Sequence, residues 1–396
     1  MKKKQKKVAI IGGGASGMVC AIVCAKAGAK VSIFEQNDTC GKKILISGNG
    51  ACNITNTDVK KSDFYTQDST LLESLLEHFS AKKMMQFLES LGIVLVAQED
   101  GRVFPYSKDA KSVHQLLLYH LQKLGVKIHY NTKITSITKE KKINDTLYDV
   151  IVLANGSKAY AKLGGNESGY TLSQLLGHRI ITPYPALVQL VTYEKDVALL
   201  QGVKRKATIK LFIDSAEIKT QQGDILFTSY GLSGLGILDL SIEAAKALKE
   251  GSYVSVEVDL LESFSIQQLS SFFATKKELT YSVALGMVVP KKVALYILKQ
   301  KNIDKDATIN QKQLKALLYE LKHLRFGIAD TKGFEYAEVC GGGVATNEIE
   351  PKTFRSKKAE GFYIIGELLD VVGKRGGYNF FFAFGSGALA GYDIIT

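Results

Sequence analysis

Three spaced glycines near the N-terminus have the types and spacing of a nucleotide-binding turn. Gly12, Gly14 and Gly17 follow the apolar run Val8–Ile11 and open an alanine-rich helical pattern that continues to Ala27. A strand, a tight glycine turn and a helix N-terminus bind the pyrophosphate of a dinucleotide, because backbone N–H groups and the positive end of the helix dipole face the phosphates. The residues expected to bind a cofactor here are Gly12, Gly14, Ala15, Ser16 and Gly17.

An acidic residue ends the second strand pattern. After a helix stop at Gly28, the run Val31–Glu35 predicts a strand. Glu35 therefore stands where an acid accepts ribose hydroxyl groups, and its charge disfavours a 2′-phosphate on the bound nucleotide.

Two later strand patterns favour FAD over NAD. Residues 148–154 form a buried-strand pattern that ends in Asn155-Gly156, and residues 362–365 form another that ends in Gly366-Glu367. An NAD domain usually completes its sheet in one stretch, whereas this chain returns to glycine-rich strand sequence only near its C-terminus. In two-dinucleotide-binding flavoproteins an acid at such a strand end binds the ribityl chain. We therefore expect Asn155, Gly156, Gly366 and Glu367 to bind FAD.

A double glycine precedes the last helical pattern. Gly376-Gly377-Tyr378-Asn379 leads into an apolar helix over residues 380–395. A helix that begins there can present N–H groups to the pyrimidine edge of the flavin and stabilise the charge of the reduced form. These four residues are further candidate FAD ligands. No second GxGxxG motif follows a strand, so NADH or NADPH, if it is the reductant, must dock transiently.

The sequence resembles the BaiN/YhiN-like flavoproteins, some of which are labelled aminoacetone oxidases or bile-acid dehydro-reductases. The most specific block is residues 41–56, GKKILISGNGACNITN, beside the family's GRKLLISGGGRCNVTN. Further matches lie at Gly101–Pro105, Gly231–Gly234, Gly341–Val344, Gly366–Asp370 and Gly376–Asn379. The resemblance covers nearly the whole chain and implies an NAD(P)- and FAD-dependent oxidoreductase. It adds these candidate FAD ligands: Lys43, Ser47, Asn49, Asn53 and Asp370.

The chain departs from the family pattern near the expected chemistry. Ala51, Ser229, Leu235 and Phe381 stand where the family carries Arg, His, Pro and Gln, and Asn155-Gly156-Ser157 replaces threonine-glycine-glycine. These losses of polar groups leave the substrate undefined. They also leave open a flavin-binding protein whose catalytic groups have decayed.

The organisation predicts an α/β fold with two domains. Residues 1–189 and 332–396 are expected to form a discontinuous, Rossmann-like, two-dinucleotide-binding FAD domain. Residues 190–331 are expected to form an inserted domain, β-rich over 190–260 and mainly helical over 261–331. Strand patterns cover 207–213 and 252–260, and helical patterns cover 266–273, 291–301 and 310–321. By resemblance, the insertion is β-barrel-like plus helical and holds substrate against the flavin.

No residue set indicates a nucleophile, a triad or a metal. The histidines show no HExxH or paired-ligand context, and the five cysteines form no CxxC. A flavin would itself carry the hydride chemistry. The catalytic residues are therefore unknown, and Tyr230, Tyr378 or a water molecule could serve as a general acid.

The formal net charge is +12, of which the leader lysines Lys2, Lys3, Lys4, Lys6 and Lys7 carry five. The other lysines are scattered, which favours anionic ligands and no stable nucleic-acid partner. The absence of a membrane span and of a signal-peptide core predicts a cytoplasmic protein. The oligomeric state stays open.

The function expected from these features is an FAD-dependent oxidoreductase that moves hydride to or from a small carbon substrate, with NADH or NADPH as a transient reductant. An oxidase of small amines that uses oxygen is one alternative. An RNA-modifying flavoprotein is another, favoured only by the basic charge.

Overall fold

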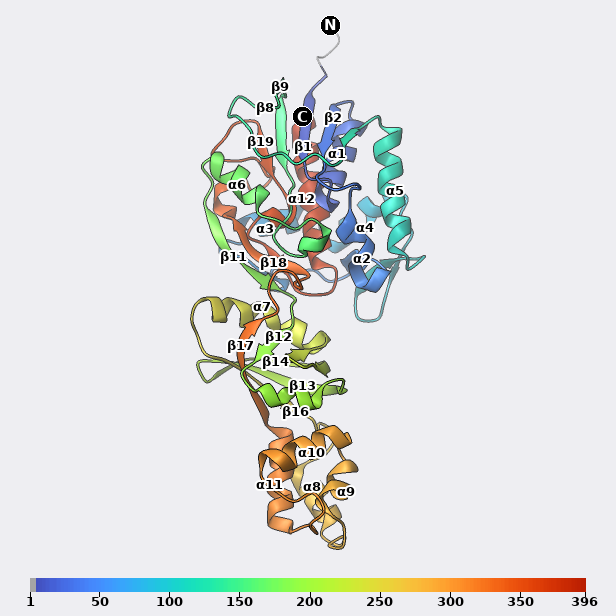
Figure 1. Ribbon diagram of the computed structural model, residues 1–396. Helices are drawn as coiled ribbons and strands as arrows, with labels where there is room; N and C mark the ends of the chain where they lie inside the picture. The colour runs from blue at the N-terminus through green and yellow to red at the C-terminus, as the bar shows by residue number, and fades with distance from the viewer. Residues whose placement is uncertain (1–4) are drawn as a thin grey trace. The chain divides into compact units, whose positions relative to one another are not determined.

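The computed structural model describes residues 5–396 and divides the chain into two compact units (Figure 1). Unit 1 comprises Met1–Tyr184 and Glu338–Thr396, and unit 2 comprises Pro185–Ala337. The leader lysines Lys2, Lys3 and Lys4 lie outside the described residues. Within residues 5–396, no helix combines the length and the apolar character that crossing a membrane requires.

Unit 1 is built on a five-stranded sheet in which all neighbouring strands are parallel, in the order β19-β10-β1-β2-β7. Its strands are β1 (Lys7–Ile11), β2 (Lys30–Phe34), β7 (Lys127–His129), β10 (Val150–Leu153) and β19 (Phe362–Ile364). The chain adds β2 and β7 on one side of β1, and then β10 and β19 on the other. The strand order therefore reverses between β1 and β10, and ligands of open α/β sheets bind at such a point, outside the carboxyl ends of the strands.

Two helices of unit 1 pack closely because one of them presents glycines. α1 (Ala15–Lys26) lies against α12 (Tyr378–Ile395). A Cβ atom at Gly387 would lie 2.3 Å from the carbonyl oxygen of Ser16, and one at Gly391 would lie 2.8 Å from Cβ of Val23. The last helix can therefore reach the start of α1 only if these positions lack side chains.

The remaining elements of unit 1 surround the sheet. The helices are α2 (Lys42–Ile46), α3 (Thr70–His78), α4 (Ala81–Ser90), α5 (Ala110–Lys123) and α6 (Ser168–Leu175). The short strands pair as β3 (Thr55–Asn56), β6 (Arg102–Pro105) and β5 (Leu95–Ala97), as β4 (Phe64–Tyr65) with β20 (Val372–Gly373), and as β8 (Lys142–Ile143) with β9 (Thr146–Leu147). A further pair, β11 (Ile180–Ala186) with β18 (Val339–Val344), lies where the chain passes between the two units.

Unit 2 contains a closed six-stranded barrel with an apolar interior. In barrel order its strands are β12 (Leu190–Thr192), β15 (Gly231–Ser233), β14 (Ala216–Phe227), β13 (Lys204–Ile213), β16 (Val254–Asp259) and β17 (Leu324–Thr331). Helix α7 (Leu235–Lys249) follows β15 in sequence. Four helices are inserted between β16 and β17: α8 (Ile266–Phe273), α9 (Tyr281–Gly286), α10 (Lys291–Gln300) and α11 (Gln311–Lys322). The predicted fold class is confirmed, including the barrel-like insertion.

We expect Gly387→Ala to destabilise the protein by about 1–3 kcal/mol, because the new methyl group overlaps the Ser16 carbonyl and pushes α12 from α1. Gly286→Ala is the matched control, since that helical glycine has open space where its Cβ would lie. The control should be neutral or stabilising by up to about 1 kcal/mol. Thermal unfolding measures both. An unchanged midpoint for Gly387→Ala would contradict the close packing of α1 and α12.

Candidate functional site

The glycine turn after β1 lies directly against the end of β10. Gly12 has φ +107°, and a Cβ atom there would lie 2.3 Å from the carbonyl oxygen of Ala154. A Cβ atom at Gly17 would lie 2.1 Å from the carbonyl oxygen of Gly12, whereas one at Gly14 would meet open space. Helix α1 then begins with no side-chain cap and no acidic residue in its first turn. The arrangement leaves a surface of backbone N–H groups that suits an anion.

Glu35 follows β2 and is buried, with 6% of its surface exposed. One carboxylate oxygen, Oε2, accepts a hydrogen bond from the Gly13 N–H at 2.8 Å. The other, Oε1, accepts from both the backbone N–H and the side-chain amide of Asn37, each at 2.8 Å. Two carboxylate oxygens offer about four acceptor positions, so one position remains for a hydroxyl donor.

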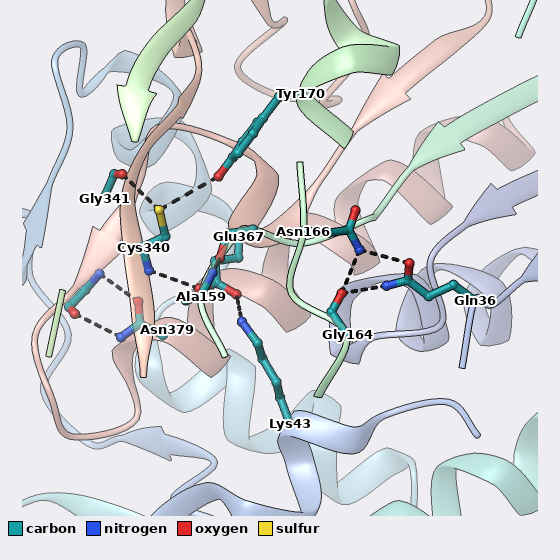
Figure 2. Close-up of polar contacts among 12 residues, drawn as sticks. Gln36, Lys43, Ala159, Gly164, Asn166, Tyr170, Cys340, Gly341, Glu367 and Asn379 are labelled. Carbon is teal, nitrogen blue, oxygen red and sulfur yellow. Dashed lines mark hydrogen bonds and ion pairs between the residues drawn. The ribbon is translucent and has the colours of Figure 1, made fainter. Parts of the chain in front are cut away.

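A third segment, residues 164–166, is hydrogen-bonded to Gln36, the residue that follows Glu35, as Figure 2 shows. The side chain of Gln36 donates to the carbonyl oxygen of Gly164 at 2.5 Å, and the amide of Asn166 donates to Gln36 Oε1 at 2.9 Å and to the Gly164 carbonyl at 2.8 Å. No motif of the sequence predicted a role for these residues. Their only local signal is the turn-type sequence Gly164-Gly165-Asn166.

Lys43 and Glu367, both expected to bind FAD, lie together and form an ion pair (Figure 2). Lys43 Nζ lies 2.7 Å from Glu367 Oε2, and Glu367 Oε1 accepts from the Cys340 N–H at 3.1 Å. Glu367 therefore joins the end of β19 to α2 and β18. The phenol of Tyr170 in turn donates to Cys340 Sγ at 3.8 Å.

The loop over residues 47–56 meets the double glycine before α12. Asn56 Nδ2 donates to the carbonyl oxygen of Gly376 at 3.1 Å. A Cβ atom at Gly377 would lie 2.3 Å from the Thr55 carbonyl oxygen, so only glycine fits there. In the amide orientation that satisfies its neighbours, Asn53 donates to that oxygen and accepts from the Gly377 N–H, both at 3.1 Å. Residues more than 300 positions apart thus form one surface.

Asn379 and Tyr378 shape the start of α12. Asn379 Oδ1 accepts from the Gly373 N–H at 2.8 Å, and its Nδ2 donates to the Gly373 carbonyl oxygen at 2.9 Å, so this side chain fixes the preceding loop. Tyr378 packs edge-on against Phe64, with ring centroids 5.9 Å apart. Burial, together with the charges of Asp63 and Asp58, raises the pKa of Tyr378 to about 12, so its phenol keeps its proton at neutral pH.

Asn155 and Gly156 lie beside the glycine turn, at the end of β10. Asn155 Nδ2 donates to Ser168 Oγ at 3.2 Å, but its Oδ1 is buried and has no hydrogen-bond partner. A Cβ atom at Gly156 would meet open space. A buried acceptor without a donor is costly, so Asn155 favours a ligand that donates there.

The other residues singled out make contacts within the protein or face solvent. Ser47 Oγ donates to the Ile44 carbonyl oxygen, Asn49 is exposed, and buried Asp370 accepts from the Gln67 N–H. Gly366 has φ +69°, and a Cβ atom there would lie 2.4 Å from Ser16 Oγ.

The departures from the family pattern include one core residue and one loop of unit 2. Phe381 is fully buried in the core of unit 1. Ser229 and Tyr230 lie in the turn between β14 and β15 of unit 2, where Lys332 Nζ sits 4.4 Å from the centre of the Tyr230 ring. The two tyrosines considered as general acids therefore belong to different units.

Among residues 5–396, no group of His, Cys, Asp and Glu side chains could hold a metal ion, and all five cysteines are free and buried. Burial raises the pKa of Cys40 and Cys340 to about 12 and that of Cys52 to about 11. Thiolate chemistry at neutral pH is therefore strongly disfavoured at these positions.

We expect the folded protein to resist iodoacetamide at pH 8, because a thiol of pKa 11 is ionised in only about one molecule in a thousand. All five cysteines should react once the protein is denatured. Mass spectrometry of the alkylated peptides measures each position. Rapid labelling of Cys52 in the folded protein would contradict its placement in the core.

The chain has full-length relatives. A family model described as HI0933-like protein Rossmann domain matches residues 6–393. The chain is 34% identical to the 3-dehydro-bile acid delta(4,6)-reductase of Clostridium scindens, over 97% of this chain and 98% of that protein. It is 30% identical to the ribosomal RNA dihydrouridine synthase of Haemophilus influenzae, over 95% of each.

A solved structure of 3-ketosteroid delta1-dehydrogenase from Sterolibacterium denitrificans is also similar, with 13% identity and a TM-score of 0.49 over 99% of this chain and 100% of that one. The family model and the full-length relatives decide the assignment. The chain belongs to the HI0933-like family, which confirms the resemblance to the BaiN/YhiN-like flavoproteins and the predicted enzyme class, an oxidoreductase.

Proposed function

We propose that unit 1 holds FAD across the carboxyl ends of β1, β2, β10 and β19, and that the protein reduces a carbon–carbon double bond conjugated to a carbonyl group. The observation that carries the proposal is the packing of the Gly12 turn against Ala154, which brings the β1 turn and the end of β10 together at the strand-order reversal. NADH or NADPH is the proposed reductant.

The residues present fit FAD. The uncapped N-terminus of α1 suits the pyrophosphate, and the free acceptor position of Glu35 suits a ribose hydroxyl. The unpartnered Oδ1 of Asn155 offers a further acceptor, and the missing side chains of Gly14 and Gly156 leave space at the same edge. The segment over residues 47–56 and the start of α12 would form the flavin end of the site.

Bound FAD would supply hydride transfer, and the chain's own residues would supply orientation and electrostatics. The N-terminus of α12 would present N–H groups beside the pyrimidine ring, and the Asn379 contacts with Gly373 would hold that end in place. Tyr378 keeps its proton at neutral pH and is our candidate donor of the proton that must accompany hydride addition.

The proposed reaction class is supported by the names of two relatives. A 3-dehydro-bile acid delta(4,6)-reductase and a dihydrouridine synthase act on different molecules, but both names describe saturation of a double bond conjugated to a carbonyl. Two substrate classes follow for this chain: a small unsaturated ketone, or a uridine in RNA. The net charge of +12 favours the second class, a uridine in RNA, although the sequence motifs by themselves do not.

Anaerobic stopped-flow spectroscopy tests the function in two steps. NADH or NADPH should bleach the flavin, and a 3-oxo-4-ene steroid or a uridine-containing RNA should then restore its absorbance without oxygen. Bleaching by aminoacetone, with recovery only on adding oxygen, would contradict the reductase and favour the amine oxidase. Failure of every donor to bleach bound flavin would favour a protein with decayed catalytic groups.

Glu35→Ala should weaken FAD binding by roughly 1.5–3 kcal/mol, about 10- to 150-fold in Kd, because hydrogen bonds to a carboxylate are lost. Glu99→Ala, at an exposed carboxylate of the same unit, is the control and should leave Kd unchanged. Flavin fluorescence quenching measures Kd, and thermal unfolding checks that both variants fold. An unaltered Kd for Glu35→Ala would remove Glu35 from the cofactor site.

A further inference from the structure

Positive charge is concentrated in one part of unit 2. The segment over residues 265–323, which we term the helical module, contains ten lysines and four carboxylates and so carries a formal charge of +6. The rest of unit 2 contains ten Lys and Arg residues against thirteen carboxylates, a charge of −3. The module therefore differs sharply from the barrel into which it is inserted.

Half of the module's lysines are neutralised or held locally. Lys299, Lys301, Lys305 and Lys322 form ion pairs, and Lys292 donates to the Gln201 carbonyl oxygen. The other five have no ion-pair partner within the described part of the chain and are exposed. They are Lys276, Lys277, Lys291, Lys312 and Lys315.

The fold gathers four of these free lysines at one end of the module. Phe273 is the last residue of α8. Its carbonyl oxygen accepts hydrogen bonds from the backbone N–H of Lys276 and from the side-chain amide of Gln311, each at 3.0 Å. The end of α8 therefore meets the start of α11, where Lys312 is the next residue. Lys315 lies on the same face of α11, three residues later. We call Lys276, Lys277, Lys312 and Lys315 the basic end.

An exposed aromatic side chain accompanies the basic end. Phe272 is 60% exposed and stands edge-on to the buried ring of Phe273, with centroids 5.1 Å apart. Buried Phe273 therefore holds the adjacent Phe272 in place, while the Phe272 ring stays accessible. Lysines bind phosphates, and an accessible ring stacks on unpaired bases, so the two features together match a single-stranded nucleic acid.

The same lysines fit a membrane surface less well. A helix that lies on a membrane needs a broad apolar face turned toward the lipid. Here the apolar faces of the module's helices are used internally, as the burial of Leu269, Val293, Ile297, Leu314 and Leu318 shows. Four large apolar side chains of the module stay exposed, namely Phe272, Val283, Met287 and Tyr319. Of these, Phe272 and Tyr319 belong to α8 and α11, the two helices that meet at the basic end.

We infer that the basic end of the helical module, together with Phe272, docks single-stranded RNA through its phosphates and one stacked base. The inference goes beyond the proposed reaction, because docking does not depend on which double bond unit 1 reduces. The scattered lysines of the sequence predicted no stable nucleic-acid partner, whereas the fold brings four of them together.

Fluorescence anisotropy with a labelled 20-nucleotide oligouridine tests the docking. The variant K276Q/K277Q/K312Q should bind at least about tenfold more weakly at 0.1 M salt, and its plot of log affinity against log salt should lose about 2 units of slope. The control K82Q/K83Q/K111Q removes three exposed lysines of unit 1 and should bind like the parent. Equal losses in the two variants would contradict a localised site.

Two further measurements separate the alternatives. Phe272→Ala should weaken oligouridine binding about fivefold or more and leave inorganic polyphosphate binding unchanged. Tighter binding of the parent to phosphatidylglycerol vesicles than to oligouridine would overturn RNA in favour of a membrane. Flavin reduction by NADPH and reoxidation by a small unsaturated ketone should stay unchanged in K276Q/K277Q/K312Q, so a failed reductase assay and a failed docking assay remain distinct.

Discussion

The close backbone approach between the β1 turn and the end of β10 is the constraint on which unit 1 depends. A carbonyl oxygen of Ala154 occupies the space that a Cβ atom at Gly12 would need, and the Gly12 carbonyl does the same at Gly17. These contacts set the distance from β1 to both β10 and α1. The same glycine turn leads into a helix N-terminus that has no side-chain cap and no acidic residue in its first turn, which suits the binding of an anion.

The rest of the candidate site is assembled by contacts between distant segments. Glu367 connects β19 with Lys43, and Asn56 connects β3 with the loop before α12. Glycine reappears at each close approach, at Gly377 against Thr55 and at Gly387 against Ser16. The C-terminal helix thus completes a surface begun by the first 60 residues, which explains why unit 1 is discontinuous in sequence.

Local patterns allowed part of this structure to be predicted. The first strand, helix and second strand follow from hydrophobic periodicity and glycine position, and α8 matches its predicted range of 266–273. α7 was not predicted, and its buried residues cover more than one face, which blurs the helical period. The side-chain partner of a given residue was harder to predict than the secondary structure. Lys43 and Glu367 were each expected to face FAD, but only the fold shows that they bind each other.

The central claim is that the surface formed at the ends of β1, β2, β10 and β19 holds FAD. Purification of the protein, denaturation and chromatography of the released chromophore test this most directly. We expect a yellow protein that releases FAD, because the glycine turn and Glu35 form a site for the adenosine half that FMN lacks. Release of FMN, or a colourless protein that takes up no added FAD, would contradict the claim.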